Sequence, residues 1–130
     1  MTIAEAAREA DVSVHTIRYY ERAGLLTPVE RNSSGHRRFS ADDVQWIVVC
    51  TRLRATGMPI RRIREYAELV EQGDGNETAR LALLQQHRED VLERMAEIER
   101  NLELIDYKIA HYRECLENAD GRPAHAAAGR

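Results

Sequence analysis

Side chains that form hydrogen bonds crowd a short segment near the amino end of the chain. Its candidates for molecular recognition are His15, Thr16, Arg18, Tyr19 and Tyr20. An arginine can bind guanine through two hydrogen bonds or pair with a phosphate, and hydroxyl groups commonly bind the DNA backbone. We therefore expect this segment to contact double-stranded DNA, with a place in the protein core as the alternative for Tyr20.

More basic side chains follow in the first half of the chain. They include Arg31, His36, Arg37, Arg38 and Arg54. Residues 1–64 hold 11 arginines and 7 acidic residues, a net charge of +4, whereas residues 65–130 carry a net charge of -7. A basic part joined to an acidic part is typical of a DNA-binding protein with a separate assembly element. For each arginine, a solvated surface position is the alternative.

Helix signals around the first segment predict a helix-turn-helix. Thr2 and Glu5 form a capping box that starts one short helix, and residues 11–12 form the break after it. Ser13 is a suitable N-cap for a second helix, which ends at Gly24. Two short helices around a tight turn, the second rich in hydrogen-bonding side chains, are typical of DNA-binding proteins.

The residues after the second helix predict a small β-hairpin wing and then two further helices. Residues 27–31 and 36–39 read as the two strands of the hairpin, joined by a turn. Ser40 and Asp43 form a second capping box for a third helix, and Pro59 opens a fourth helix. The expected buried face of the fourth helix consists of Ile60, Ile63, Ala67 and Val70.

The most regular feature is an apolar seam with heptad spacing in the second half of the chain. Its residues alternate at spacings of four and three over about four heptads, and Arg88 is the one interruption. The expected dimerisation positions are Leu84, Val91, Met95, Ile98, Leu102, Ile105, Ile109, Tyr112 and Leu116. A single helix of about 60 Å cannot bury this seam against so small a domain, so we expect two copies of the chain to pair.

Length and composition predict a soluble, cytoplasmic protein. The chain has 130 residues, of which 32% are charged and 5% aromatic. No apolar run approaches the ~20 residues of a membrane span, and the amino end lacks the pattern of a secretory signal. The two cysteines, Cys50 and Cys115, are expected to be reduced thiols. Because the sequence has no recognisable catalytic, phosphate-binding or metal-binding constellation, we expect no enzyme activity, cofactor or metal.

These observations predict a mainly α protein with three parts. Residues 1–72 are expected to form a winged helix-turn-helix DNA-binding domain. Residues 76–116 are expected to form a long coiled-coil dimerisation helix. Residues 117–130, rich in small and polar side chains, are expected to form a disordered tail.

Several motifs in the first 72 residues resemble one protein family. The matching residues are 16–21, 24–26 and 35–39, together with Pro28, Arg31, Arg54, Gly57 and Met58. They closely resemble the DNA-binding part of the MerR family of bacterial transcriptional regulators. The helix expected at 76–116 is similar to the antiparallel dimerisation helix of that family.

The resemblance implies a function and assigns roles by position. Members of the family are homodimers that bind a palindrome between the two promoter elements, where they bend and untwist the DNA so that RNA polymerase can engage it. His15 and Arg18 lie where such proteins touch the major groove, and His36 stands where many members carry tyrosine. The positions that would bind phosphates are Arg31, Arg37 and Arg54.

The resemblance leaves the signal open. Metal-responsive members carry a cysteine pair near the end of the dimerisation helix, whereas Cys115 stands alone there with His111 and His125. Iron–sulfur members need four cysteines, and drug-binding members need an additional domain. Small members that respond to aldehyde or nitrosative stress use one cysteine, which aligns with Arg52. Cys50 lies two residues earlier, so a thiol sensor and an inert core residue are both open roles for it.

An adaptor or scaffold protein is the alternative to a regulator. Such a protein would act through the coiled coil without direct control of a promoter. It would bind DNA only weakly, and salt would suppress that binding, whereas a regulator would bind a specific site tightly.

Overall fold

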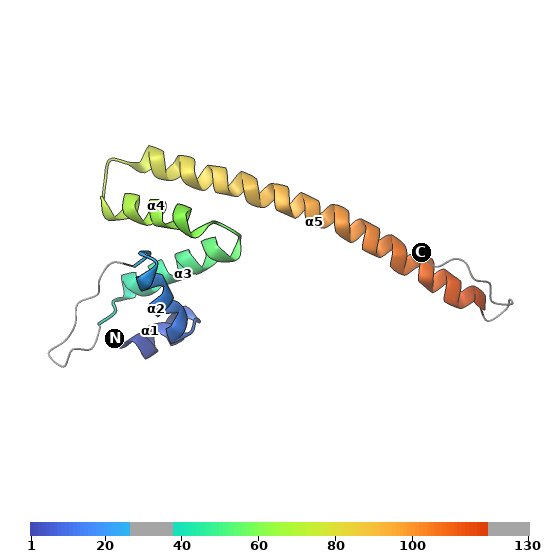
Figure 1. Cartoon of the computed structure of the whole chain (residues 1–130), viewed down its shortest axis with the longest axis horizontal. Coiled ribbons are helices and arrows are strands. Elements are labelled where there is room, and N and C mark those ends of the chain that lie inside the picture. Colours follow the sequence, from blue (N-terminus) through green and yellow to red (C-terminus); the bar gives the residue numbers. More distant parts are fainter. Residues whose placement is uncertain (27–37, 120–130) are drawn as a thin grey trace. The chain divides into compact units, whose positions relative to one another are not determined.

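The computed structural model describes residues 1–26 and 38–119, which form five α-helices (Figure 1). The helices are α1 (Ile3–Ala10), α2 (Val14–Arg22), α3 (Ala41–Ala55), α4 (Ile60–Glu71) and α5 (Glu77–Ala119). The described residues contain no strand. Residues 27–37, which include most of the predicted hairpin, lie outside the described part of the chain, so the wing stays a prediction.

The chain divides into two compact units. The first, which we call the head unit, comprises Met1–Arg88, and the second begins at Glu89. The head unit therefore includes the first turns of α5 and continues past residue 72, where the DNA-binding domain was expected to end. The reason is that Leu83 of α5 is buried in the core of the head unit.

Both predicted capping boxes are confirmed. At the start of α1, the Glu5 amide donates to Thr2 Oγ1 at 3.2 Å and the Thr2 amide donates to Glu5 Oε1 at 3.1 Å. The hydrogen bond from the Thr2 amide lowers the pKa of the Glu5 carboxyl. At the start of α3, the Asp43 amide donates to Ser40 Oγ at 3.1 Å and the Ser40 amide donates to an Asp43 oxygen at 2.8 Å. Each pair satisfies amide groups that would otherwise lack partners at a helix end.

The turn between α1 and α2 has the expected helix-turn-helix form. Asp11 adopts a left-handed conformation with φ 57°, and the Val12 amide donates to the Ala7 carbonyl at 3.0 Å. Ser13 Oγ then accepts a hydrogen bond from the Thr16 amide at 3.0 Å and caps α2. Gly24, with φ +79°, ends the helical run after the cap residue Ala23. A positive φ suits glycine because it has no Cβ to clash with the backbone.

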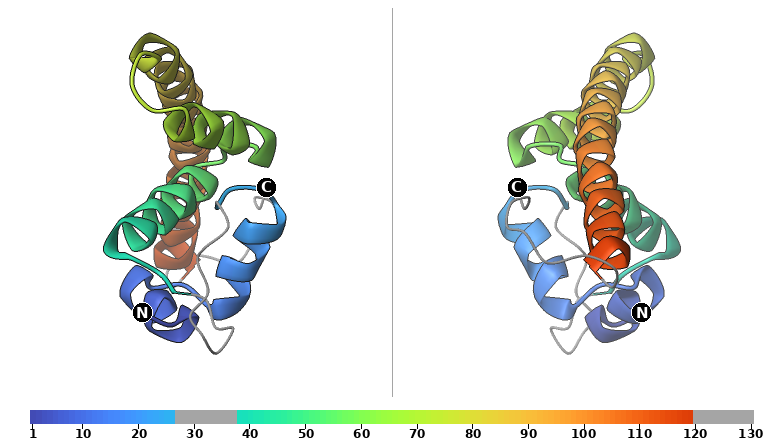
Figure 2. Two further views of the ribbon diagram at one scale, coloured as in Figure 1. Left: turned by 90° about the vertical axis from the view of Figure 1, so that its left-hand side faces the viewer. Right: turned by 90° about the vertical axis from the view of Figure 1, so that its right-hand side faces the viewer.

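Helices α1 to α4 enclose a small apolar core. Figure 2 shows α1, α2 and α3 gathered around one another, with α4 beyond α3. The core residues are Ala6, Ala7, Ala10, Ile17, Tyr20, Leu25, Leu26, Phe39, Ile47, Cys50, Met58, Ile63 and Leu83. The alanines of α1 leave room for close packing against α2 and α3, so a short amphipathic helix suffices to close the core.

The buried face of α4 differs in part from the prediction. Ile63 is fully buried, but Val70 is 36% exposed. Tyr66 and Leu69 pack against the core instead. The seven-residue interval from Ile63 to Val70 would keep Val70 on the same face, but in the last turn of α4 Leu69 packs against the core and Val70 stays partly exposed.

The connection between α4 and α5 is held by polar contacts. Asn76 donates through Nδ2 to the Leu69 carbonyl at 2.8 Å and accepts from Arg80 Nε at 2.6 Å. Arg80 also donates to the carbonyl of Gly73, which has a positive φ of 85°. A hydrogen bond of 2.8 Å between Thr56 Oγ1 and His87 Nε2 joins the end of α3 to α5. The start of α5 is thereby fixed within the head unit.

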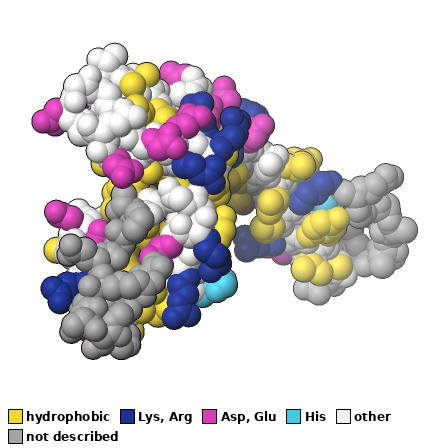
Figure 3. All heavy atoms as spheres, turned by 60° about the vertical axis from the view of Figure 1, so that its left-hand side comes forward, with side chains coloured by type: hydrophobic (Ala, Val, Ile, Leu, Met, Phe, Trp, Pro, Cys, Tyr) yellow, Lys and Arg dark blue, Asp and Glu magenta, His cyan; other side chains and the backbone are white. Residues whose placement is uncertain are grey.

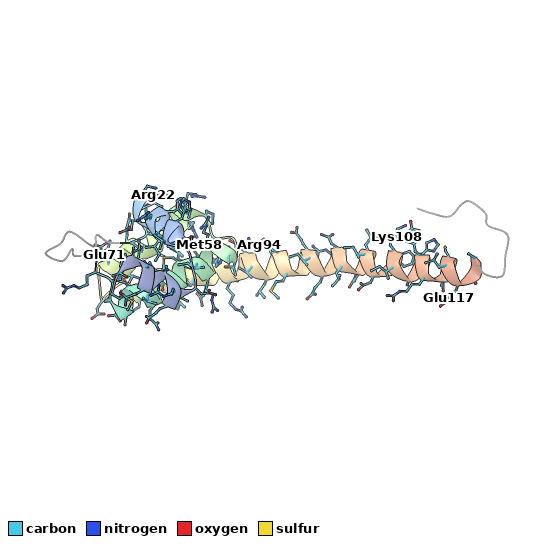
Figure 4. The ribbon with its side chains drawn as sticks, turned by 90° about the horizontal axis from the view of Figure 1, so that it is seen from below. Arg22, Met58, Glu71, Arg94, Lys108 and Glu117 are labelled. Carbon is cyan, nitrogen blue, oxygen red and sulfur yellow. The ribbon has the colours of Figure 1, made fainter. Side chains whose placement is uncertain are left out.

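The described part of the second unit is the continuation of α5, whose seam residues are exposed. Examples are Met95 at 51%, Ile98 at 64% and Leu116 at 71% exposure. Figure 4 shows side chains projecting from this stretch of α5, with Lys108 and Glu117 on different sides of the helix. The helix ends at Ala119, three residues beyond the predicted end at 116, and residues 120–130 of the predicted tail lie outside the described part.

Within the described residues, no helix is both long enough and apolar enough to cross a membrane.

Candidate nucleic-acid interface

Helix α2 is amphipathic, with one face in the core and another in solvent. Ile17 and Tyr20 are buried, whereas His15 and Arg18 are exposed and Thr16 is half-buried. The two buried residues are three positions apart, as expected for neighbours on one helix face. The predicted recognition side chains therefore lie on a helix that is anchored from its opposite side.

Tyr20 is a core residue, which was the alternative that the sequence left open. Its side chain is 1% exposed, and its hydroxyl is 2.9 Å from Thr51 Oγ1. Thr51 in turn donates to the Ile47 carbonyl at 2.8 Å, so this polar pair is satisfied inside the protein. A buried hydroxyl with an internal partner is not available to DNA, and Tyr20 is accordingly removed from the set of candidate contacts.

Tyr19 forms a pair with Arg54 of α3. The guanidinium carbon of Arg54 lies 5.1 Å from the centroid of the Tyr19 ring, a distance typical of a cation–π contact. Arg54 is exposed in the last turn of α3, and Tyr19 is half-buried on α2. The pair brings together a phenol and a guanidinium from two helices, and both groups can bind phosphate oxygens.

Arg64 of α4 is a positioning residue that the sequence did not identify. Its Nε donates to the Ala23 carbonyl at the carboxyl end of α2, at 2.9 Å. Its side chain also passes Gly24, where an added Cβ would lie 3.4 Å from Arg64 Nε. This contact fixes the end of α2. Arg64 and Ala23 are 41 positions apart in sequence, so no local sequence pattern predicts the contact.

A second contact holds the segment that follows α2. Trp46 Nε1 donates to the Leu25 carbonyl at 2.7 Å, and the indole stacks on Tyr66 with centroids 5.7 Å apart and an interplanar angle of 27°. Leu25 itself is buried. The backbone leading from α2 toward residue 27 is therefore tied to α3 through one side chain.

The remaining predicted contacts fall at or beyond the edge of the described chain. Arg38 is exposed next to the buried Phe39, whose amide donates to the Met1 carbonyl at 2.7 Å. Arg31, His36 and Arg37 lie outside the described residues. Figure 3 shows Lys and Arg side chains at several places on this face, one group of them with a histidine beside it. Arg22, in the last turn of α2, projects from the outer edge of the head unit in Figure 4.

The two cysteines have different surroundings. Cys50 is fully buried in the core, and desolvation raises the pKa of its thiol to about 12. A thiol with so high a pKa is a poor nucleophile, which favours the core role for Cys50 over the sensor role. Cys115 is partly exposed on α5, with Sγ 3.7 Å from His111 Nε2. The described residues contain no group of three or more potential metal ligands.

Comparisons with known proteins agree with this arrangement. Residues 1–69 match the family described as MerR HTH family regulatory protein, and residues 44–107 match the family described as MerR, DNA binding. The chain is 37% identical over 113 residues to an uncharacterized HTH-type transcriptional regulator of Haemophilus influenzae, a match that covers 87% of this chain and 84% of that protein.

Solved structures have the same fold. A MerR family protein from Listeria monocytogenes is 37% identical, with a TM-score of 0.85 over 92% of this chain and 91% of its own. HiNmlR, a MerR family regulator lacking the sensor domain and bound to promoter DNA, is 36% identical, with a TM-score of 0.79 over 89% of this chain and 92% of its own. The expected mainly helical architecture is thus confirmed. The chain belongs to the MerR family of helix-turn-helix regulatory proteins.

Proposed function

We propose that this chain is a homodimeric regulator of transcription that binds promoter DNA in the cytoplasm and controls access of RNA polymerase. The observation that carries the proposal is the structure of α2. Ile17 anchors this helix in the core, while His15 and Arg18 stand exposed on its other side. A helix held in this way can enter the major groove and present its polar side chains to base edges.

The proposed contacts divide into two kinds. His15, Thr16 and Arg18 read the bases, with Arg18 suited to a bidentate hydrogen bond with guanine. The residues proposed to bind the DNA backbone are Tyr19, Arg31, His36, Arg37, Arg38 and Arg54. Four of them belong to the predicted hairpin wing at residues 27–39, and the other two are the stacked pair of α2 and α3. Backbone contacts of this kind set the orientation of the protein on the duplex.

We further propose that two copies pair through α5 as an antiparallel coiled coil. The support is the exposed apolar seam: from Met95 to Leu116 its side chains are between 42% and 71% exposed in the single chain. Apolar surface on this scale marks an interaction site. In this view residues 1–72 are the DNA-binding domain, and the dimerisation helix predicted at residues 76–116 is part of α5, which ends at Ala119.

A dimer of this kind explains how binding can control transcription. Two recognition helices held at one separation fit both halves of a palindromic site only if the DNA bends or untwists. Such a distortion costs on the order of 1 to 6 kcal/mol, which additional phosphate contacts can offset. We propose that this distortion aligns the two promoter elements for RNA polymerase.

Selection of binding sites tests the proposal. The full chain would be used to enrich duplexes from a random pool, and the enriched sequence would be titrated at several salt concentrations. We expect a palindromic site and an affinity at least a thousandfold above that for unrelated DNA. An adaptor or scaffold would enrich no sequence, and its weak binding would disappear as the salt concentration rises.

A further inference from the structure

We propose that the head unit contains a binding site for a small organic cation with an aromatic body, an inference that goes beyond the DNA-binding function. The site is a cavity of about 570 Å³ formed by the segment after α2, the first half of α3 and the second half of α4. Cavities between about 300 and 1,000 Å³ are typical of small-molecule sites. We call it the α3–α4 pocket.

The α3–α4 pocket has an apolar floor that is built and held in place. Trp46 lines it, and the hydrogen bond to the Leu25 carbonyl and the stacking on Tyr66 fix the orientation of its indole. Val49 and Val70 also line the pocket, and each is 36% exposed. The fixed aromatic ring and the two partly exposed valines offer an apolar surface on which the ring of a ligand can pack.

The rim of the pocket is acidic. Asp42, Glu68 and Glu71 line it and are exposed, while the carboxylate of Asp43, also in the lining, caps α3. Among the described residues, 1–26 and 38–119, the lining includes no Lys, Arg or His. Arg64 passes Gly24 of the lining, and its Nε donates to the Ala23 carbonyl.

The apolar floor and the acidic rim of the pocket together define the class of ligand. The carboxylates of α3 and α4 favour a positive charge and disfavour an anion. The indole face attracts a cation and packs against an apolar body at the same time. An ammonium or guanidinium group attached to an aromatic ring satisfies both conditions, whereas a purely apolar molecule leaves the carboxylates without a counter-charge.

The position of the pocket suggests what the ligand would affect. Gly24, Leu25 and Leu26 of the lining directly follow α2 and lead toward residues 27–37. The hydrogen bond from Trp46 to the Leu25 carbonyl links this segment to the floor of the pocket. A bound cation would therefore act on the segment between the recognition helix and the predicted wing, without competing for groups that bind phosphates.

Fluorescence of the full chain provides the test, because Trp46 is the only tryptophan in the sequence. The probes are benzyltrimethylammonium, neutral benzyl alcohol and anionic benzenesulfonate, titrated at constant ionic strength. We expect a saturable change in Trp46 emission with the cation, and only weak linear changes with the other two probes. A linear response to the cation, or equal responses to all three probes, would overturn the proposal.

Two variants locate the binding. Glu71→Gln removes a rim charge and should weaken binding of the cation by about twofold to fivefold. Glu65→Gln makes the same change on α4 outside the lining of this pocket and should leave the affinity unchanged. Equal affinities of the two variants would also contradict the site. DNA affinity, measured separately, should be the same for both variants, so failure of the pocket and failure of the DNA-binding function are distinguishable.

Discussion

Arg54 at the end of α3 lies over the ring of Tyr19 in α2, with its guanidinium carbon 5.1 Å from the ring centroid. The contact holds the guanidinium beside the recognition helix, whereas a free arginine would sample many rotamers. Arg54→Ala should therefore weaken binding to all duplexes by a similar factor. It should also reduce the slope of log affinity against log salt concentration by about the amount expected for one phosphate contact. Titrations of specific and unrelated DNA at several salt concentrations measure both effects. A loss confined to the specific site would contradict a phosphate-binding role.

Arg18→Ala should have a different effect. If Arg18 pairs with a base edge, its removal costs about 1 to 3 kcal/mol of specific affinity and relaxes the preference at one base pair in each half-site. Competition assays against single-base variants of the selected site measure this change. Arg8, exposed on α1 outside the proposed interface, provides the matched control. Operator binding by Arg18→Ala as tight as that of the parent protein would remove α2 as the recognition helix.

Substitutions of the two neighbouring tyrosines should have different effects, one on stability and the other on DNA binding. Tyr20→Phe removes the buried hydroxyl that lies 2.9 Å from Thr51 Oγ1, and it should lower the free energy of unfolding by about 0.5–1.5 kcal/mol. Its DNA affinity should be unchanged. Tyr19→Phe should do the reverse, because its hydroxyl is proposed to bind the DNA backbone. Denaturant unfolding and DNA titration of both variants provide the comparison, and a stable Tyr20→Phe protein with weakened DNA binding would contradict it.

Charges in the seam should dissociate the dimer. Aspartates at both Ile98 and Leu102 would place unpaired charges in an apolar interface, so dimer formation and operator binding should be lost together. Leu104 is 62% exposed on α5 outside the seam, and Leu104→Asp serves as the control that should remain dimeric. Sedimentation measures the outcome. A stable dimer of the double variant would rule out pairing through the seam.

The direction of pairing is also testable. The seam has the same spacing when it is read in either direction from Arg100. In an antiparallel pair in which the two copies of Arg100 lie opposite each other, Val91 of one copy therefore faces Ile109 of the other. In the same pair Arg88 faces Tyr112. A parallel pair would bring two copies of Arg88 together, which is unfavourable. With Cys115→Ser as background, a variant with cysteines at both Val91 and Ile109 should form disulfide-linked dimers on oxidation. The variant with a cysteine at Val91 alone should not, and its efficient cross-linking would indicate a parallel pair.

Burial should make Cys50 unreactive in the folded protein. Because burial raises the pKa of its thiol to about 12, about one molecule in ten thousand carries the thiolate at pH 8. Under native conditions a thiol reagent should modify Cys115 quickly and Cys50 only when the chain unfolds. The unfolded chain releases this proton near the ordinary pKa of 9.0, so a rise in pH above 9 should favour unfolding. Rapid native modification of Cys50 at pH 7 would restore the sensor role.

The sequence alone determined the parts of this protein that depend on neighbouring residues. The capping boxes of Thr2 with Glu5 and of Ser40 with Asp43, and the cap at Ser13, join residues three positions apart, so their spacing was sufficient to predict them. The long α5 was likewise predictable, because its heptad period repeats from Leu84 to Leu116.

Only the tertiary structure decided which side chains meet across helices. Tyr20 and Thr51 are 31 positions apart, and Arg64 and Ala23 are 41 positions apart. Such contacts depend on how the helices pack. The sequence pattern of a single helix does not show which other helix each of its faces meets. For the same reason the sequence left the role of Tyr20 open between the core and the DNA interface, and it did not reveal the positioning role of Arg64 or the α3–α4 pocket. Each of them exists only where side chains from separate helices converge.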